Sequence, residues 1–361
     1  MKRLAAFLIA LCLVFCAPFC GALADDGAES ADLLGNGSPT AADAARMLRL
    51  LCLTPAQANG HTECDLTQNG SVNCSDACAA LMCACGEISD LDAFAERLST
   101  GLLGEKYFDR FYYAGVYDDL NGNYKSANVS VSIISGRAYD NDYFLADIYV
   151  QDIACLTNVF SQDEYMGDTE TAAKLLNRCE SGIVGINGDF YSLNLFGPLV
   201  RNGVKYVKNI TRALDIAILC KNGELLTYRY RILTADMLAT LDVYQIWVFG
   251  PALLDDNGNT KTEFRSHVTA RNPRSVIGYY EPGHYAFLIV DGRREHSMGI
   301  TMKDLSSFCK ELGFTRAYNL DGGQSSVLQS KSGAINIPFD GGRTLSDLFV
   351  VCDLSGEGTD E

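Results

Sequence analysis

The stretch TMKDLSSFCKELGFTRAYNLDGG (residues 301–323) joins an amphipathic helix pattern to a short strand that ends in an acidic residue. Its apolar residues recur at the i, i+3, i+4, i+7 spacing of one helix face: Leu305, Phe308, Cys309 and Leu312. Gly313 suits the position after a helix, and the apolar segment 316–320 then leads into Asp321. This order predicts a helix packed on a sheet, with a carboxylate where the strand ends.

A second segment, TAAKLLNRCESGIVGINGDF (171–190), repeats this design, with Gly182 as the expected helix cap. Its strand leads into Asn187-Gly188-Asp189. Because side chains alternate along a strand, Asn187 and Asp189 should share a face, as should Asn319 and Asp321. A third strand exit, FLIVDGRR (287–294), presents Asp291. At any single exit, an Asx turn is the alternative to chemistry.

The rest of the large domain is rich in strand-like runs and poor in helix patterns. Turns at Asn222-Gly223 and Pro282-Gly283 separate several of these runs, which are 128–136, 143–153, 214–220, 224–233, 275–280 and 285–290. We therefore predict an α/β (α+β) fold, a mixed multi-stranded sheet domain with few helices. It spans 107–354, with a motif-bearing core at 180–352, and an acidic tail (355–361) follows.

Length and charge limit the class of protein. The chain has 361 residues, of which 48% are apolar and 20% charged, so more than one domain is expected. Its formal charge is −16, from 29 basic and 45 acidic residues. Binding to a phosphate backbone requires clustered Lys and Arg, and no such run is present, so no nucleic-acid partner is expected.

The first 24 residues have the features of a secretory signal peptide. Lys2 and Arg3 precede an apolar run, and Ala22-Leu23-Ala24 offers a small-x-small cleavage site. We therefore expect a secreted or extracytoplasmic protein with no membrane span in the mature chain. A retained N-terminal anchor is the alternative.

Cysteine usage fits the same compartment. Three of the 14 cysteines lie in the expected signal peptide, and six of the other eleven fall in residues 52–85. Disulfides are the default prediction outside the cytosol, although the odd total leaves at least one thiol and the pairing cannot be deduced. A zinc cluster is the alternative, but Cys74-x3-Cys78 and Cys83-x-Cys85 match no usual zinc spacing.

Residues 65–76, DLTQNGSVNCSD, have the spacing of a calcium-binding loop. Calcium takes about six to eight oxygen ligands, and a glycine at the sixth position permits the sharp turn that gathers them. The expected ligands are Asp65, Thr67, Asn69, Ser71 through its carbonyl, Asn73 and Asp76. The last position holds aspartate rather than the glutamate of an EF-hand, and a helical segment follows.

An earlier segment, DLLGNGSPTAAD (32–43), repeats this frame, although Leu34 and Pro39 depart from it. The two loop–helix units resemble a dockerin, a duplicated module that binds calcium and a cohesin partner. The resemblance covers 32–86 and implies Ca²⁺ and a cohesin-like partner for a small all-α, cysteine-rich, dockerin-like module at 25–90, followed by a linker at 91–106. A cysteine-stapled helical hairpin without metal is the alternative.

Arginines and glycines near the strand exits suggest an anion-binding site. Arg274 follows a turn in RNPRSVIGYY (271–280), and Arg343 follows two glycines in FDGGRTLSDLFVV (339–351). Guanidinium groups suit phosphate, although a surface salt bridge is the alternative for Arg274 and for Arg271 beside it. The segment 322–326, GGQSS, is either a flexible turn or the wall of an anion-binding hollow. No histidine has a triad context, which argues against a serine hydrolase.

A series of motifs resembles the phosphodiester glycosidase family; in chain order they read GINGDFYS, FGPALLDDNG, NPRSVIGY, FLIVDGR, GITMKDLSSFCKELGFTRAYNLDGGQSSVL and GGRTLSDLFVV. The resemblance runs from about residue 180 to 352. It implies hydrolysis of a sugar-1-phosphodiester, of the N-acetylglucosamine-1-phosphodiester type, to free sugar and phosphomonoester. An extracellular glycan or wall polymer is the expected substrate. Gln324 replaces a third glycine of the family, which we expect to alter sugar preference.

The resemblance also suggests roles, because carboxylates can activate water or stabilise an oxocarbenium-like transition state while arginines bind phosphate. Asp321 and Asp291 are the expected acid–base or electrostatic pair, with Asp189 as a third candidate. The expected substrate-binding residues are Asn187, Arg274, Asn319, Gly322, Gly323, Gln324, Ser325, Ser326 and Arg343. No cofactor is assigned to catalysis.

Two other functions stay open from the sequence. The first is a glycan-binding or exopolysaccharide-assembly protein that keeps the fold without turnover. The second is a metal-dependent phosphodiesterase in which Asp189, Asp291 and Asp321 are metal ligands.

Overall fold

The computed structural model describes residues 39–51, 62–192, 197–207, 214–229, 232–264, 266 and 268–354. The chain divides into two compact units, Met1–Ser99 and Thr100–Glu361. The expected signal peptide, the acidic tail and most of the first calcium-type loop lie outside the described residues. Within the described part, no helix is long and apolar enough to cross a membrane.

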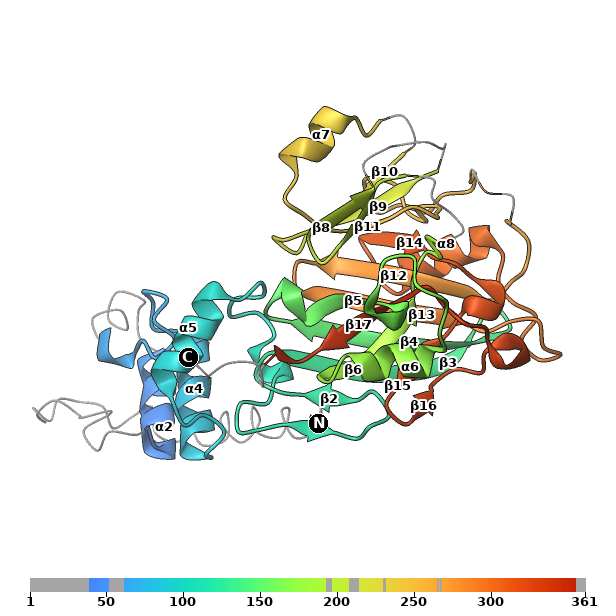
Figure 1. Cartoon of the computed structure of the whole chain (residues 1–361). Helices are drawn as coiled ribbons and strands as arrows, with labels where there is room; N and C mark the ends of the chain where they lie inside the picture. Colours follow the sequence, from blue (N-terminus) through green and yellow to red (C-terminus); the bar gives the residue numbers. More distant parts are fainter. Residues whose placement is uncertain are drawn as a thin grey trace, which may run out of the picture. The chain divides into compact units, whose positions relative to one another are not determined.

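The described part of the first unit is helical (Figure 1). It contains α2 (Ala41–Leu50), η1 (Thr62–Cys64), α4 (Cys74–Ala84) and α5 (Leu91–Thr100). A capping box starts α4, because the side chains of Asn73 and Asp76 each accept a hydrogen bond from a backbone N–H in the first turn. Residues 91–100, which we expected to be linker, form a helix instead.

The second unit contains three sheets (Figure 1). Sheet 1 has the order β1 (Tyr117–Asp118), β2 (Tyr124–Lys125), β3 (Val129–Ala138), β4 (Asn141–Val150), β13 (His284–Val290), β12 (Arg274–Glu281) and β14 (Arg316–Asn319). Sheet 2 has the order β16 (Gly333–Ala334), β15 (Leu328–Ser330), β6 (Gly182–Asn187), β17 (Asp347–Cys352) and β5 (Leu156–Phe160). Sheet 3 has the order β10 (Leu225–Tyr228), β9 (Ile216–Cys220), β11 (Val243–Trp247), β7 (Leu199–Arg201) and β8 (Val204–Val207).

Short helices complete this unit. The α-helices are α6 (Ala172–Arg178), α7 (Ala235–Thr240) and α8 (Met302–Glu311). The 3-10 turns are η2 (Phe108–Arg110), η3 (Ile153–Cys155), η4 (Ser161–Asp163), η5 (Gly323–Ser325) and η6 (Phe339–Gly341).

Helix α8 forms where the sequence pattern predicts it. Thr301 caps its first turn by accepting from the Asp304 N–H at 3.1 Å, and Gly313 follows the helix with a φ of 85°. Its apolar face packs on sheet 1 around Leu305, which is completely buried. Helix α6 covers sheet 2 in the same way. The expected cap at Gly182 is wrong, because α6 ends at Arg178 and Gly182 begins β6.

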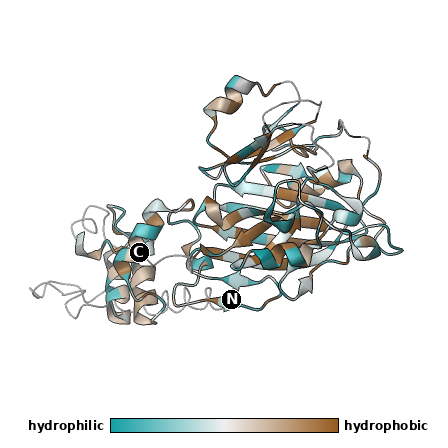
Figure 2. Cartoon of the chain, viewed as in Figure 1, coloured by the Kyte–Doolittle hydropathy of each residue, from teal (hydrophilic) through white to brown (hydrophobic). Residues whose placement is uncertain are grey.

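The other faces of the sheets enclose one shared core. Along β13, Phe287 and Ile289 point into this core, whereas Ala286 and Leu288 point toward α8. Figure 2 shows the hydrophobic residues concentrated along these strands. Because both faces of β13 are buried, the polar side chains next to this strand in the sequence lie beyond its end.

The sheet type differs from the prediction. The runs expected at 128–136, 143–153, 214–220, 224–233, 275–280 and 285–290 are confirmed as β3, β4, β9, β10, β12 and β13. Every strand pair among the described residues is antiparallel, so the sheets are not mixed and the fold is α+β. The predicted disulfides are absent at four described positions, where Cys155, Cys220, Cys309 and Cys352 are buried thiols.

We predict that Leu305→Ala lowers the free energy of unfolding by about 2–5 kcal/mol, because it opens a cavity between α8 and sheet 1. Urea denaturation measures the change. The matched control is Ile134→Ala, since Ile134 is 45% exposed on β3 and its truncation leaves no cavity. Equal losses for the two variants would contradict the packing described for α8.

Candidate active site

The predicted strand exits meet at one edge of the second unit. Strands β13 and β14 both pair antiparallel with β12, so they run in the same direction and end together. Asn187, at the end of β6, ties sheet 2 to this edge. Its Nδ2 donates to the Asp321 carbonyl at 2.8 Å, and its Oδ1 accepts from Ser275 Oγ at 2.7 Å. Asn187 is completely buried, so it positions the Asp321 turn rather than touching a ligand.

Asp321 holds its carboxylate at the start of the glycine-rich turn. Its Oδ1 accepts from the Gly322 N–H at 2.9 Å. Its Oδ2 accepts from Ser325 Oγ at 2.6 Å and from Arg343 Nη2. The Asp321 side chain is 11% exposed and the Arg343 side chain 37% exposed, so this ion pair reaches the surface.

Phe190 supports the exposed arginine. The Arg343 guanidinium lies over the Phe190 ring, 4.5 Å from its centroid. The backbone of Phe190 has a φ of 53°, a left-handed conformation that bulky residues rarely adopt. Such a conformation costs about 1–3 kcal/mol and persists only where the surroundings enforce it. Phe190 is therefore fixed beneath Arg343 by the structure around it.

A second exposed arginine, Arg293, contacts the same turn and was not among the predicted residues. Its Nη2 donates to Asn272 Oδ1 at 2.9 Å, and its guanidinium lies 5.1 Å from the centroid of the Phe339 ring. A Cβ on Gly323 would come within 3.1 Å of Arg293 Nη2. Its signal in the sequence was its place in the same exit as Asp291, two residues further on. Together Arg293 and Arg343 give this turn two exposed positive charges.

The glycines of the turn allow a close contact with the backbone of a neighbouring segment. The Gly323 N–H donates to the Pro273 carbonyl at 3.1 Å. A Cβ on Gly322 would lie 2.7 Å from that carbonyl oxygen, so only glycine permits this approach. We predicted that Gly322 would let a substrate approach the backbone. In the structure, the Pro273 carbonyl lies at that close distance instead.

Arg274, which we predicted to bind phosphate, hydrogen-bonds to backbone carbonyls of the protein instead. It is 3% exposed, and its Nη2 donates to the carbonyls of Val268 at 2.9 Å and Ala270 at 2.6 Å. Burial, together with the nearby charge of Arg293, lowers the pKa of Arg274 to about 10. Arg274 therefore anchors the segment that carries Asn272, whereas Arg293 is the exposed arginine near this turn.

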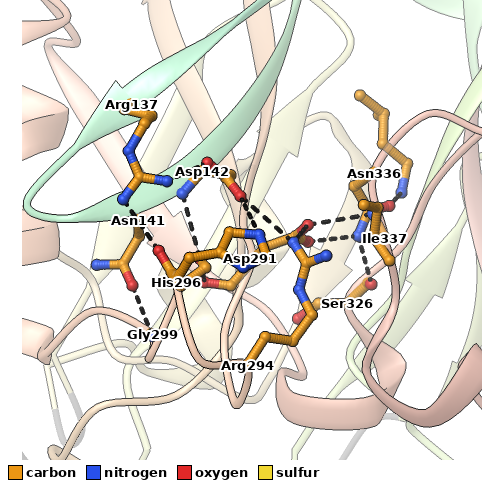
Figure 3. A network of polar contacts seen from close by, with 12 residues as sticks. Arg137, Asn141, Asp142, Asp291, Arg294, His296, Gly299, Ser326, Asn336 and Ile337 are labelled. Atoms are coloured by element: carbon orange, nitrogen blue, oxygen red, sulfur yellow. Dashed lines mark hydrogen bonds and ion pairs between the residues drawn. The ribbon is translucent and has the colours of Figure 1, made fainter.

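Asp291 joins two loops (Figure 3). Its Oδ1 accepts from Asn336 Nδ2 at 2.8 Å, and its Oδ2 accepts from the Ile337 N–H at 3.1 Å and from Arg294 Nη2 at 2.8 Å. Asn336 also donates to the Ser326 carbonyl at 3.2 Å. Asp291 is 1% exposed, and burial raises its pKa. These contacts use both Asp291 carboxylate oxygens to hold the two loops together, so Asp291 is a positioning residue.

The same network fixes the loop after β13 to the β3–β4 hairpin (Figure 3). Asp142 accepts from Arg137 Nη1 at 2.6 Å and lies 3.4 Å from His296 Nε2. Asn141 Oδ1 accepts from the Gly299 N–H at 2.6 Å. The loop that carries Arg293 is thus held along its length.

Asp189 shares no hydrogen-bond partner with Asp321. Its Oδ1 accepts from Arg201 Nη2 at 2.7 Å, and its Oδ2 accepts from the Val248 N–H at 2.8 Å. Arg201 Nε donates to Asp347 Oδ2 at 3.0 Å, and all three side chains are buried. The expected shared face of Asn187 and Asp189 is wrong, because β6 ends at Asn187 and the chain turns at Gly188.

The remaining predicted residues differ in exposure. Asn319 is buried and donates to the Gly250 carbonyl at 2.9 Å and the Leu320 carbonyl at 2.8 Å, which indicates a structural role. Ser326 is also fully buried. Gln324 is half-buried, and its Nε2 lies 3.4 Å from Asp340 Oδ2. Gln324 is therefore the member of this set that a ligand could reach.

A metal site built from the three aspartates does not fit these contacts. Asp189, Asp291 and Asp321 each bind separate donors, and all three are buried and paired with an arginine. In the part of the chain that the structure describes, no group of three or more His, Cys, Asp or Glu side chains could hold a metal ion. The structure therefore gives no support to the metal-dependent phosphodiesterase.

We predict that Arg201→Met lowers the free energy of unfolding by about 3–5 kcal/mol at pH 7, because it leaves two buried carboxylates without their cation. Burial raises the pKa of Asp347 to about 6. A carboxyl whose pKa is raised by folding stabilises the folded state at low pH. This contribution to stability is lost as pH rises from about 4 to about 6. The destabilisation should therefore be smaller at pH 5 than at pH 7, as measured by urea denaturation.

Arg178→Met is the matched control for this prediction, because Arg178 pairs with Asp163 and Glu170 at the surface. Its effect should be much smaller than that of Arg201→Met. An Arg201 variant that loses no more stability than the control, or that loses more at pH 5, would show that the buried ion pairs are described wrongly.

Comparison with known proteins gives a family match for part of the chain. Residues 180–352 match the model of the family described as Phosphodiester glycosidase. The SPbeta prophage-derived uncharacterized protein YomE of Bacillus subtilis (strain 168) is 29% identical over 187 residues, which is 49% of this chain. The chain spans 29% of the length of that relative.

Two solved structures are similar at lower identity. The zebrafish N-acetylglucosamine-1-phosphodiester alpha-N-acetylglucosaminidase catalytic domain has a TM-score of 0.49 and 18% identity, over 62% of this chain and 83% of its own. A hypothetical protein from Synechocystis has a TM-score of 0.47 and 12% identity, over 62% of each chain. The segment that matches the phosphodiester glycosidase family, residues 180–352, contains Asp321, Arg293 and Arg343 and the exits of β6, β13 and β14.

Proposed function

We propose that the second unit hydrolyses a sugar-1-phosphodiester, releasing the sugar and leaving a phosphomonoester. The observation that carries this proposal is the ion pair of the largely buried Asp321 with the exposed Arg343, beside a second exposed arginine at the same turn. The family match of residues 180–352 supports the same class of reaction. An extracellular glycan or wall polymer bearing N-acetylglucosamine-1-phosphodiester groups, acted on by a secreted protein, is the substrate that we propose.

The two exposed arginines would bind the diester phosphate. A guanidinium fork matches two phosphate oxygens, and Arg343 is held for this by the Phe190 ring beneath it. Arg293 is held by Asn272 and Phe339. Positive charge fixed around the phosphate would also stabilise the negative charge that develops on it when the sugar–oxygen bond breaks.

Asp321 would act on the sugar side of that bond. An ionised carboxylate has about four lone-pair sites, and three donors occupy three of them, two on Oδ2 and one on Oδ1. The remaining lone pair is on Oδ1, which could accept a proton from an attacking water or face an oxocarbenium-like transition state. Because a phosphomonoester is a weakly basic leaving group, the reaction has less need of a strong general acid.

We predict that the wild-type protein releases free sugar from the methyl phosphodiester of α-N-acetylglucosamine 1-phosphate. Asp321→Asn should lower kcat by about 10²–10⁴-fold, the range for loss of a general base. Arg343→Met and Arg293→Met should raise KM and also lower kcat, because each removes a phosphate ligand and a charge that stabilises the phosphate in the transition state. Released sugar and methyl phosphate are quantified by chromatography.

Arg316→Met is the matched control, because Arg316 lies at the start of β14, at the opposite end from Asp321, and donates to the Thr315 carbonyl. The absence of sugar release by the wild type over a panel of such diesters would refute the hydrolase and favour a glycan-binding protein. Cleavage on the other side of phosphorus that a chelator abolishes would favour a metal-dependent phosphodiesterase.

For the first unit we propose a Ca²⁺ site in the 65–76 loop, with a cohesin-like protein as partner. The Asp65 carboxylate accepts from the backbone N–H groups of Asn69 at 3.1 Å and Gly70 at 2.8 Å, and Gly70 has a φ of 84°. These contacts support the proposal, because they bend the loop around Asp65. Asp76 is buried and accepts from Thr67 Oγ1 at 3.0 Å, which brings the loop ends together.

We predict that calcium raises the melting temperature of the first unit's transition and that Asp65→Ala removes this shift, because a ligand that binds only the folded state stabilises it. Differential scanning calorimetry of the whole chain, with calcium or with a chelator, measures it. Asp92→Ala is the control, since Asp92 lies on α5 outside the loop. A melting curve of the wild type that calcium leaves unchanged would refute the site.

A further inference from the structure

Two cysteines of the second unit contact each other at the end of sheet 2 that lies away from the candidate active site. Cys179 follows helix α6, and Cys352 is the last residue of β17. Their side chains are hydrogen-bonded to each other, and Cys179 Sγ also lies 4.0 Å from Ser181 Oγ. Both cysteines are thiols in the structure.

The backbone around the two cysteines fixes this contact. Cys352 pairs with Gly182 across β17 and β6. The Gly182 N–H donates to the Cys179 carbonyl at 2.9 Å, and a Cβ on Gly182 would lie 3.2 Å from the Cys179 Cβ. Because cross-strand partners project on the same face, the missing side chain of Gly182 leaves the room in which the two sulfurs meet. The Asp353 N–H donates to the Ser181 carbonyl at 3.1 Å, which holds the end of β17 in this register.

A third thiol, Cys155, lies near the pair but on the other face of the sheet. Along β17, Val350 packs toward α6 and Val351 points into the shared core. By the alternation of a strand, Cys352 therefore projects toward α6, where Cys179 packs. Cys155 belongs to the shared core, and Cys352 Sγ contacts its backbone carbonyl at 3.6 Å. The geometry thus favours Cys179 as the partner of Cys352.

The two thiols differ in how they are reached from solution. Cys179 lines a surface cleft of about 450 Å³ between the end of α6 and β5. Cys352 is 2% exposed. Its hydrogen bond with Cys179, together with burial, raises the pKa of the Cys352 thiol. A reagent in solution therefore meets Cys179 first and reaches Cys352 through it.

We propose that Cys179 and Cys352 are a modification site at which a soluble disulfide oxidises the pair to one intramolecular disulfide that fastens β17. The Cys179 thiolate attacks one sulfur of the soluble disulfide and releases the first thiol. The Cys352 sulfur, losing its proton, then attacks the Cys179 sulfur and displaces the second thiol. Two protein thiols are oxidised, one soluble disulfide is reduced to two thiols, and the two protons pass to those thiols.

The position of this bond gives it a structural effect. Strand β17 lies between β6 and β5 in sheet 2 and is the last described strand of the chain. Chain ends are poorly ordered unless they are tied down. The bond would also close a long loop that contains Asp321, Arg293 and Arg343. Closing a long loop restricts the unfolded chain strongly, so the folded state gains stability. The extracytoplasmic compartment that we expect for the chain is oxidising, which favours the bonded state.

Peptide mapping of the whole chain tests the pairing, because trypsin places the three cysteines on separate peptides. These are 138–174 with Cys155, 179–201 with Cys179 and 344–361 with Cys352. The chain is treated with oxidised glutathione, denatured in iodoacetamide and digested without reductant. We expect mass spectrometry to find 179–201 joined to 344–361, and dithiothreitol to separate them.

Three results of the mapping would overturn the proposal. The first is alkylation of both Cys179 and Cys352 after the oxidation. The second is the joining of 344–361 to 138–174, which would pair Cys352 with Cys155. The third is glutathione that stays on Cys179, because Cys352 would then fail to displace it.

Thermal unfolding of the whole chain tests the fastening of β17. In the second unit's transition, the oxidised wild type should melt about 5–10 °C above the reduced wild type. Cys179→Ser should remove this difference between the oxidised and reduced forms. Cys155→Ala is the matched control and should keep it, because Cys155 packs in the shared core. Equal melting temperatures of the oxidised and reduced wild type, or a difference that Cys179→Ser retains, would overturn the proposal.

Discussion

The buried guanidinium of Arg201 is the interaction on which the site depends. It extends from β7 in sheet 3 and bonds Asp189 after β6, Asp347 at the start of β17 and the Ile246 carbonyl of β11. One cation with two carboxylates leaves a negative charge in a dry interior, which is unfavourable. Burial raises the pKa of Asp347 to about 6, so a proton neutralises the set as pH falls below that value.

This charge arrangement explains the Asn-Gly-Asp turn. A Cβ on Gly188 would overlap the Asp347 carboxylate, so the position between Asn187 and Asp189 accepts only glycine. With Asp189 held on one side and Asn187 on the other, the chain leaves β6 in a fixed direction. That direction places Phe190 under Arg343 and Tyr191 among the rings that follow.

The polar groups at the strand exits therefore divide by exposure. Asn187, Arg274 and Asp291 are buried, and their hydrogen bonds hold loops in place. Arg293 and Arg343 are exposed, and aromatic rings support them from below. A site that binds an anion needs both classes, because mobile arginines would lose conformational entropy on binding.

The sequence predicted the elements better than the roles. Helix α8, β14 and the acidic strand exit follow from a local pattern of apolar and capping residues, and tertiary packing agrees with that pattern. The roles of Arg274 and Asp189 could not be predicted in this way. Whether an arginine faces solvent or a carbonyl depends on segments far away in the chain, such as the Val268 carbonyl that Arg274 binds.

The failure at Asp189 has a specific physical cause. The rule that residues two apart share a face holds only while the strand continues, and β6 ends at Asn187. At the other exit, β14 ends at Asn319, and Asn319 and Asp321 again have different partners. Arg293 was missed for the opposite reason, because an arginine after a strand is ordinary until its contact with Gly323 is known.

In the proposed reaction, the ion pair of Asp321 and Arg343 would connect phosphate binding with chemistry. In the structure, Arg343 shares its charge with Asp321 and Ser325. A bound phosphate would draw part of that charge to itself, since a bidentate phosphate–guanidinium contact, made of two parallel hydrogen bonds, competes with the carboxylate. Asp321 would then share its cationic partner with the bound phosphate. Binding of the diester would thus act directly on the contacts of Asp321, and the buried hydrogen bond from Asn187 would keep the Asp321 turn in place while Arg343 moves.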